Sequence, residues 1–225
     1  PGTDISGVVV DVAPDVREFA VGDEVFGMLR FPDAQGAAYA EYVAAPASDV
    51  ARKPASLDHA HAAGAPMAGL TAWQYLIEVG HSHPNPLQAV PHRPVPLGFG
   101  KTVLINGAAG GVGHLALQLA KWKGARVIAV SSGEHEAFLR ELGADEFIDY
   151  TKTSAEQVVR EVDLVLDAVG GPATARFLRS ITRGGALNPV FPLGYVDTGE
   201  AATLGVTVSA TQVRASGSQL AALGR

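Results

Sequence analysis

The chain of 225 residues is long enough for one large domain or two smaller ones, and its content of 47% hydrophobic and 18% charged residues is typical of a globular protein. A formal net charge of −6 disfavours nucleic acid and anionic membrane surfaces as partners, and no apolar run reaches the roughly 18 residues of a membrane-spanning helix. The absence of cysteine excludes disulfides, thiolate metal ligands and a cysteine nucleophile, and we expect a cytoplasmic protein.

Residues 1 to about 58 have the pattern of a small β domain. Short apolar runs occur in DISGVVVDVAPDV, FAVGDEVFGML and GAAYAEYVAAP, and Pro-Asp or Gly-Asp turns lie within the first two. Short strands at this spacing predict a small barrel or sandwich. Tyr39 and Tyr42 could flank a substrate, but aromatic residues in a strand are usually core residues, which is the expectation here.

The sequence changes character at His59. An alanine-rich segment begins there and predicts helix, which Gly64, Pro66 and Gly69 interrupt. Residues 81–100 contain five of the fourteen prolines and have neither a helical nor a strand period, which predicts a surface loop. The chain starts within a strand-like pattern and ends at LAALGR, which is typical of an unfinished helix, so we expect protein to be missing at both ends.

After Lys101 the pattern alternates between strands and helices. We expect strands at residues 102–106, 126–130, 146–150, 163–169, 185–190 and 206–213, with helices between the first five. This alternation predicts an α/β fold, in which helices cover both faces of a parallel sheet. The expected domains are therefore a β domain at residues 1–58 and an α/β domain at residues 59–225.

A glycine-rich turn follows the first of these strands. Gly107, Gly110 and Gly113 form a G-x-x-G-x-x-G pattern between a strand and a helix with one apolar stripe. The first glycine would allow the tight turn, the second the close approach of a diphosphate, and the third the packing of the helix on the sheet. Free amides at the start of the helix would bind the phosphates, so this context favours a dinucleotide site over a turn without a ligand.

The end of the second strand indicates which dinucleotide binds. NAD sites usually carry an Asp or Glu there, which binds the ribose 2′-hydroxyl, whereas this chain has Ser131 and Ser132. Because that position carries no acid, it would not repel a 2′-phosphate, and two hydroxyls could donate to it. NADP is therefore favoured over NAD. Glu134 and Glu136 follow, with His135 between them, and we expect them in the exposed first turn of the next helix.

The sequence resembles the medium-chain dehydrogenase/reductase superfamily, in particular its zinc-independent, quinone-oxidoreductase-like branch. The motifs that carry the resemblance cover most of the chain in order: PGTDISGVVVDV, VGDEVFG, GAAYAEYV, AGLTAW, VLINGAAGGVGHLALQLAKWKGARVIAV, LRELGADEFIDY and VDLVLDAVGG. The resemblance implies a partial GroES-like substrate domain, a doubly wound Rossmann domain and a homodimer. Relative to that family, we expect the first strands of the substrate domain and the C-terminal return into it to be absent.

Two departures from zinc-dependent relatives argue against a metal. Their Gly-His-Glu motif is replaced by Gly2, Thr3 and Asp4, and their four cysteines are absent. The chain does contain histidines in two His-x-His pairs and one further position, but without the carboxylate pattern of a metal site. These histidines are His59, His61, His81, His83 and His92.

The resemblance also implies a set of cofactor-binding residues. Thr71 and Phe191 would lie near the nicotinamide, and Tyr150 near the adenosine. Ser131 and Ser132 would meet the 2′-phosphate, with His135 near a position where many relatives have lysine. The residues expected along the diphosphate are Gly107, Ala108, Ala109, Gly110, Gly111, Val112 and Gly113, and those expected to line the crevice at the end of the fourth strand are Ala168, Val169 and Gly170.

We therefore expect an NADPH-dependent oxidoreductase that transfers hydride to a quinone or an α,β-unsaturated carbonyl without a metal. Such chemistry rests mainly on the cofactor, so no catalytic residue is assigned. An alcohol dehydrogenase-like enzyme is a first alternative, which the missing zinc ligands disfavour. A non-catalytic NADPH-binding sensor or scaffold is a second, because its cofactor site would be the same. The expected partners are small-molecule substrates, and neither nucleic acid nor membrane.

Overall fold

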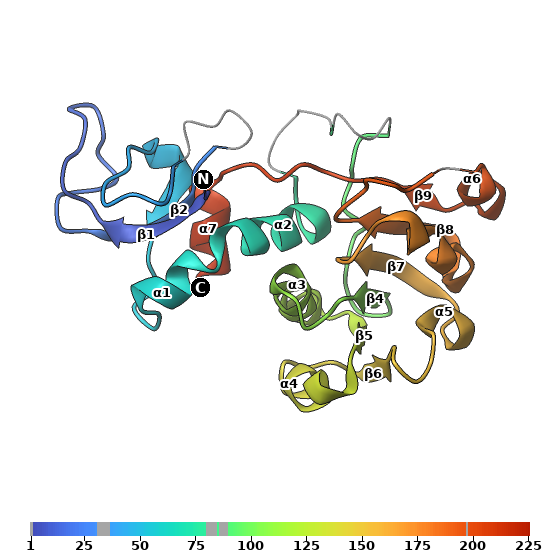
Figure 1. Cartoon of the computed structure of the whole chain (residues 1–225). Coiled ribbons are helices and arrows are strands. Elements are labelled where there is room, and N and C mark those ends of the chain that lie inside the picture. Colours follow the sequence, from blue (N-terminus) through green and yellow to red (C-terminus); the bar gives the residue numbers. More distant parts are fainter. Residues whose placement is uncertain (1, 31–36, 80–84, 86–89, 197) are drawn as a thin grey trace. The chain divides into compact units, whose positions relative to one another are not determined.

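The computed structural model describes residues 2–30, 37–79, 85, 90–196 and 198–225. Its contacts divide the chain into two compact units (Figure 1). The first unit comprises Pro1–Thr71 together with Val213–Arg225, and the second comprises Ala72–Gln212. No helix within the described ranges is both long enough and apolar enough to cross a bilayer.

The first unit is built on a three-stranded antiparallel sheet in the order β1-β2-β3. Strand β1 is Asp4–Val8, β2 is Glu24–Met28 and β3 is Val50–Arg52. Phe26 and Met28 lie two residues apart on one face of β2, and both are buried in the core of this unit. The small β domain expected from the sequence is confirmed, with three strands.

Helices complete the first unit. The short helix η1 is Ala47–Asp49 and α1 is His59–Ala63. Helix α2, Pro66–Leu76, begins in the first unit and continues into the second. The helical prediction after residue 58 is thus confirmed, and Pro66 starts the second helix because proline is tolerated at the first helical position. The interruption expected at Gly69 is absent, since α2 continues through this residue.

The end of the chain returns to the first unit, contrary to the expectation that this return is absent. Helix α7, Gly217–Leu223, packs on β3, and Leu220 is buried in the same core as Phe26. A Cβ on Gly217 would lie 2.1 Å from the carbonyl oxygen of Val50, so only glycine permits this approach. The first unit therefore extends beyond the expected boundary at residue 58 and includes residues 213–225.

The strand expected in GAAYAEYVAAP is not present in its described part, residues 37–46. Tyr39 and Tyr42 are 83% and 74% exposed, so the prediction that they are core residues is wrong. A β-pattern becomes a strand only when a neighbouring strand accepts its backbone hydrogen bonds. Within the described residues, no strand of the first unit pairs with this segment.

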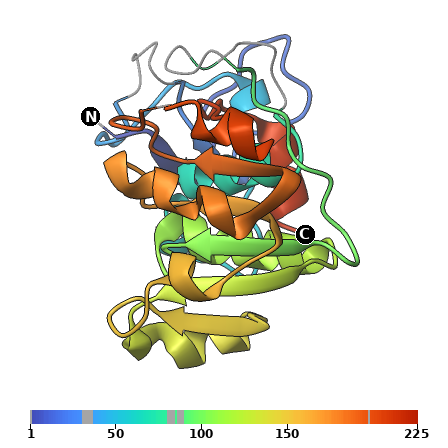
Figure 2. The same cartoon turned by 90° about the vertical axis from the view of Figure 1, so that its right-hand side faces the viewer.

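The second unit contains a six-stranded parallel sheet in the order β6-β5-β4-β7-β8-β9 (Figure 2). The strands are β4 Thr102–Asn106, β5 Arg126–Ser131, β6 Glu146–Asp149, β7 Val162–Asp167, β8 Ile181–Pro189 and β9 Thr207–Val208. This is the strand order of a doubly wound dinucleotide-binding fold. The expected α/β fold is confirmed, although the last strand is shorter than predicted.

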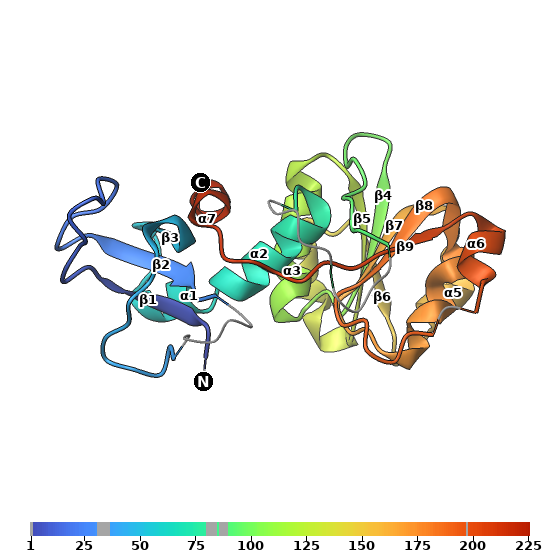
Figure 3. The ribbon, with the colours of Figure 1, turned by 90° about the horizontal axis from the view of Figure 1, so that it is seen from above.

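Helices cover both faces of this sheet. Figure 3 shows α3 on one face and α5 with α6 on the other. The helices of the second unit are α3 Gly111–Trp122, η2 Gly133–His135, α4 Glu136–Glu141, α5 Ala155–Val158, η3 Pro172–Ser180 and α6 Glu200–Leu204. Burial on both faces explains the nearly continuous apolar sequences of β4, β5 and β7.

The proline-rich loop can be compared with the structure only in part, since residues 81–84 and 86–89 lie outside the described residues. Residues 90–100 form neither helix nor strand, apart from a single bridge between Pro91 and Ala210. The described part of the segment therefore agrees with the predicted loop.

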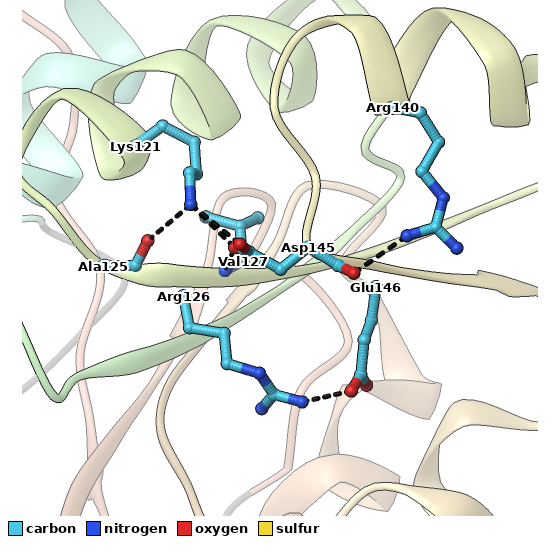
Figure 4. Close-up of polar contacts among 7 residues, drawn as sticks. All are labelled: Lys121, Ala125, Arg126, Val127, Arg140, Asp145 and Glu146. Carbon is cyan, nitrogen blue, oxygen red and sulfur yellow. Dashed lines mark hydrogen bonds and ion pairs between the residues drawn. The ribbon is translucent and has the colours of Figure 1, made fainter.

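A polar network joins α3, β5 and β6 near the amino ends of these two strands (Figure 4). Asp145 accepts hydrogen bonds from Lys121 Nζ at 2.8 Å and from the amide of Val127 at 2.7 Å. The carbonyl of Asp145 accepts one from Arg140 at 2.8 Å, and Arg126 pairs with Glu146. Asp145 thereby connects the helix that precedes β5 with the start of β5 itself.

We expect Asp145→Asn to destabilise the second unit at pH 7 by about 1 kcal/mol, because a partly exposed charge-assisted interaction is lost. Burial acts to raise the pKa of Asp145, but hydrogen bonds from Lys121 and Val127 and the nearby positive charges outweigh it and lower the pKa. The carboxylate therefore contributes stability above its unfolded-state pKa, and this contribution is lost as the pH falls through the lower folded-state value.

Urea unfolding of the wild type and of Asp145→Asn at pH 7 and at pH 3 tests this expectation. The difference between the two proteins should be smaller at pH 3 than at pH 7, because acid favours protonation of the Asp145 carboxylate and the charge-assisted interactions are then lost. Glu141→Gln, at an exposed carboxylate at the end of α4, is the matched control and should be neutral. An equal difference at both pH values would contradict the assignment.

Candidate dinucleotide-binding site

The direction of the strand order reverses between β4 and β7, and their carboxyl ends meet there. The two strands are parallel neighbours, with Asn106 opposite Asp167 in the last paired position. The amide of Ala168 donates to the carbonyl of Asn106 at 3.0 Å, which extends the pairing by one residue. In open α/β sheets this position forms the crevice in which ligands bind.

The turn after β4 depends on Gly107. Its φ is +74°, in the left-handed region that favours glycine. Its amide and that of Ala108 both donate to the carbonyl of Val130, at 3.1 and 3.0 Å. A Cβ on Gly107 would lie 2.9 Å from Cγ2 of Val169, so the absent side chain also allows the loop after β7 to approach.

The third glycine brings the helix onto the turn. A Cβ on Gly113 would lie 2.2 Å from the carbonyl oxygen of Gly107 and 2.7 Å from Cα of Ala108. Such a contact is impossible without moving backbone, so helix α3 can take this position only with glycine there. The predicted packing role of this glycine is therefore visible in the structure.

The second glycine differs from the other two. Gly110 has an ordinary φ of −74°, and a Cβ there would meet only the carbonyl oxygen of Gly107, at 3.3 Å. Gly110 and Gly111 are exposed, Ala109 and Val112 are half-buried, and Ala108 is buried. Since the protein itself leaves the space beside Gly110 open, its lack of a side chain suits the close approach of a ligand.

The start of α3 has the properties of an anion-binding site. Gly110 is its N-cap, and no side chain caps the helix. The amides of Gly111, Val112 and Gly113 therefore have no acceptor within the helix, and the positive end of a 12-residue helix dipole adds to them. A diphosphate fits this arrangement, because its oxygens would accept from these amides.

The loop after β7 is held by a buried carboxylate. Asp167 is 1% exposed and accepts from Asn106 Nδ2 at 2.7 Å and from Thr174 Oγ1 at 2.6 Å. It also accepts from the amides of Val169 and Gly170, at 3.2 and 3.0 Å. All four of these donors are uncharged, so the loop is positioned by hydrogen bonds rather than by an ion pair.

Phe191 meets the same loop. Gly170 has a φ of +69°, and a Cβ there would lie 2.3 Å from the carbonyl oxygen of Phe191. The amide of Gly171 donates to this carbonyl at 3.1 Å. Val169 and Phe191 remain 61% and 52% exposed, so the two loops present an apolar surface beside the glycine turn. The predicted grouping of Ala168, Val169, Gly170 and Phe191 is thus brought together by the fold.

The predicted adenosine residues gather at the end of β5. Ser131 is buried, and its carbonyl accepts from the amide of Tyr150 at 3.1 Å. Ser132 Oγ donates to Glu134 at 3.1 Å, and His135 Nε2 lies 3.8 Å from the same carboxylate. The Tyr150 side chain is 60% exposed. These residues adjoin one another, and their contacts to a nucleotide remain predictions.

Sequence reasoning missed three polar residues at these strand ends. Asn106 and Asp167 stand out in retrospect, since each is a polar last residue after a run of buried apolar residues in its strand. Asp149 gave no such signal, because its proximity to β5 comes from strand pairing: it lies opposite Ser131. A Cβ on Gly133 would lie 2.6 Å from Asp149 Oδ2, so a carboxylate does adjoin the turn after β5.

Thr71, expected near the nicotinamide, belongs to the first unit. Its hydroxyl donates to the carbonyl of Met67 at 2.6 Å within α2, and the residue is 6% exposed. Its proposed contact with the cofactor remains a prediction.

The described histidines have partners of their own. His59 Nδ1 lies 2.8 Å from Ser6 Oγ, and His61 Nδ1 lies 2.8 Å from Asp58. His92 is buried between Ser209 Oγ and the carbonyl of Tyr75. His81 and His83 lie outside the described residues. The described part of the chain contains no group of three or more side chains suited to hold a metal.

Two family models match the chain. The alcohol dehydrogenase GroES-like domain matches residues 1–55, and the zinc-binding dehydrogenase domain matches residues 111–221. The quinone oxidoreductase from Coxiella burnetii is a solved structure that aligns with 99% of this chain and 66% of its own, with a TM-score of 0.80 and 32% identity.

Curated relatives are longer than this chain. The mitochondrial NAD(P)H oxidoreductase RTN4IP1 of Mus musculus is 40% identical over 173 residues, which is 76% of this chain and 40% of that protein. The 2-methylene-furan-3-one reductase of Solanum lycopersicum is 37% identical over 193 residues, which is 83% of this chain and 45% of that protein. The chain thus spans less than half the length of these relatives.

The contrast between two glycines generates a prediction. Gly110→Asp should reduce NADPH affinity about a hundredfold or more, because the new carboxylate would cap the α3 amides that the diphosphate needs and would repel its charge. Aspartate is a favourable N-cap, so stability should not fall. Gly113→Ala should instead destabilise the fold by about 1–3 kcal/mol or more, since its Cβ overlaps backbone.

Calorimetric titration with NADPH and thermal unfolding of both variants check this pair of outcomes. Unchanged NADPH affinity in Gly110→Asp would refute the placement of the diphosphate. Unchanged stability in Gly113→Ala would refute the packing of α3 on the turn.

Proposed function

We propose that this chain, which belongs to the medium-chain dehydrogenase/reductase superfamily, is an NADPH-dependent oxidoreductase that reduces a quinone or an α,β-unsaturated carbonyl without a metal. The observation that carries the proposal is the uncapped start of α3, with open space beside Gly110, at the point where the strand order reverses. The names of the relatives, a 2-methylene-furan-3-one reductase and a quinone oxidoreductase among them, support the substrate class.

The residues of the chain bind and orient, and the cofactor supplies the redox chemistry: bound NADPH is the hydride donor. The amides of Gly111, Val112 and Gly113 would hold the diphosphate, since no side chain caps the start of α3. The loop held by Asp167 places the apolar side chain of Val169 beside the glycine turn, next to Phe191. An apolar surface there excludes water from the reacting carbon and suits an apolar quinone or enone.

Two observations support NADPH over NADH. Strand β5 ends on Ser131 and Ser132 follows it, so the turn carries two uncharged hydroxyls; that of Ser132 donates to Glu134 and would exchange this acceptor for a phosphate oxygen. The neighbouring carboxylate, Asp149, is paired with Lys152 at 3.1 Å, so its charge is compensated. A site that places a cation beside two hydroxyls suits a 2′-phosphate better than a bare ribose hydroxyl.

Three further features remain proposals. The family resemblance supports a homodimer, the lack of cysteine in the sequence supports a cytoplasmic location, and the reaction is proposed to need no metal ion. The lack of cysteine in the sequence, and of a ligand cluster among the described residues, supports the last of these. Light scattering on the purified protein tests the dimer.

The activity is tested by incubating the purified protein with NADPH and either 1,4-benzoquinone or a panel of enones, and following NADPH oxidation. We expect oxidation that is unaffected by dialysis against EDTA, and an affinity at least about tenfold higher for NADPH than for NADH. Tight NADPH binding without oxidation across the panel would indicate the sensor or scaffold. Oxidation of alcohols that EDTA abolishes would indicate an alcohol dehydrogenase-like enzyme.

A further inference from the structure

The segment that follows β6 lies against the turn that follows β5. Ser131 is paired with Asp149 in the parallel register, and the amide of Tyr150 donates to the carbonyl of Ser131. Residues 149–152 therefore adjoin residues 131–133, although α4 and most of β6 lie between the two segments in the sequence.

Lys152 brings a positive charge to this turn. Its Nζ lies 3.8 Å from the position that a Cβ on Gly133 would occupy, and 3.1 Å from Asp149 Oδ2. The lysine side chain is 79% exposed, whereas the Asp149 side chain is only 12% exposed. The ammonium group is thus at the surface, directly beside the glycine that follows Ser131 and Ser132.

Hydrogen bonds hold the Asp149 carboxylate in place beside this lysine. Its Oδ1 accepts from the amide of Thr151 at 3.0 Å and from the hydroxyl of Thr151 at 2.6 Å. The hydrogen bond from Thr151 is the main cause that lowers the pKa of Asp149, so the carboxylate is ionised at neutral pH. Lys152 is held close to the turn by this charge.

The lysine is nevertheless free to change partner. An exposed ion pair contributes little stability, because water screens it and the long side chain loses entropy. A phosphate monoester carries up to two negative charges and three acceptor oxygens, so it is a stronger partner for an ammonium than a single carboxylate. Lys152 can therefore turn from Asp149 toward a phosphate bound at residues 131–133 at small cost.

The other charges near this turn make a cation necessary. Glu134 Oε1 lies 3.1 Å from Ser132 Oγ. Asp149 Oδ2 lies 2.6 Å from the position that a Cβ on Gly133 would occupy. Lys152 compensates the charge of Asp149, but the Glu134 carboxylate would repel a 2′-phosphate, and hydroxyls alone do not offset that repulsion. His135 Nε2 is turned toward Glu134, at 3.8 Å.

We propose that Lys152 is the residue that selects NADPH: it binds the 2′-phosphate of the adenosine ribose together with Ser131 and Ser132. This assignment rests on the proposed use of NADPH. It differs from the sequence-based expectation in that the cation comes from the segment after β6 and not from the helix that follows β5.

The test is calorimetric titration of the full chain with NADPH and NADH, and with adenosine 2′,5′-bisphosphate as a probe of the 2′-phosphate alone. Lys152→Ala should weaken NADPH and the bisphosphate about tenfold, the value of one charge-assisted contact, and leave NADH within about twofold. Lys123→Ala is the matched control, since Lys123 lies at the other end of α3 over the ring of Trp122, and it should leave all three ligands unchanged.

The outcomes separate this inference from the proposed function. A wild type that prefers NADPH, with Lys152→Ala unchanged, would overturn the role of Lys152 and leave the NADPH proposal standing. An equal loss of NADPH and NADH in Lys152→Ala would also overturn it, because the effect would then be on the site as a whole. A wild type that binds both cofactors equally would overturn both proposals.

Discussion

The close approach of Gly113 to the carbonyl oxygen of Gly107 is the constraint on which the site depends. A side chain at residue 113 would reach within 2.2 Å of that oxygen, so the helix and the turn can touch only through bare backbone. This contact directs the start of α3, whose first three amides have no acceptor within the helix, toward the carboxyl ends of the strands. Without it the amides would point elsewhere, and the open space beside Gly110 would have no phosphate-binding partner.

A second set of interactions places the loop after β7 against this turn. Asp167 accepts from a side-chain amide, a hydroxyl and two backbone amides, all within the buried end of the sheet. A buried carboxylate is tolerable only when its lone pairs are satisfied in this way. The turn proposed to bind the diphosphate and the apolar surface near Phe191 are therefore positioned by one connected network of β4 and β7.

The sequence allowed the glycine turn, the parallel sheet and most of the strand positions to be predicted, because these follow from local spacing and composition. The strand expected in GAAYAEYVAAP is absent from the described residues of that segment. Its composition, with Tyr39 and Tyr42, is typical of a strand, yet a strand forms only with a partner. The return of residues 213–225 was also missed, since nothing local shows that Gly217 lies against Val50.

The sequence by itself determined where the glycine turn lies that is proposed to bind phosphate, since glycine at residues 107, 110 and 113 between a strand and an amphipathic helix leaves few other structures open. It also determined that β5 ends on serine rather than on an acid. Only the tertiary structure decided which charges surround those serines. Strand pairing brings Asp149 and Lys152 to the turn after β5 from a position about twenty residues later, and charge acts through space rather than along the chain.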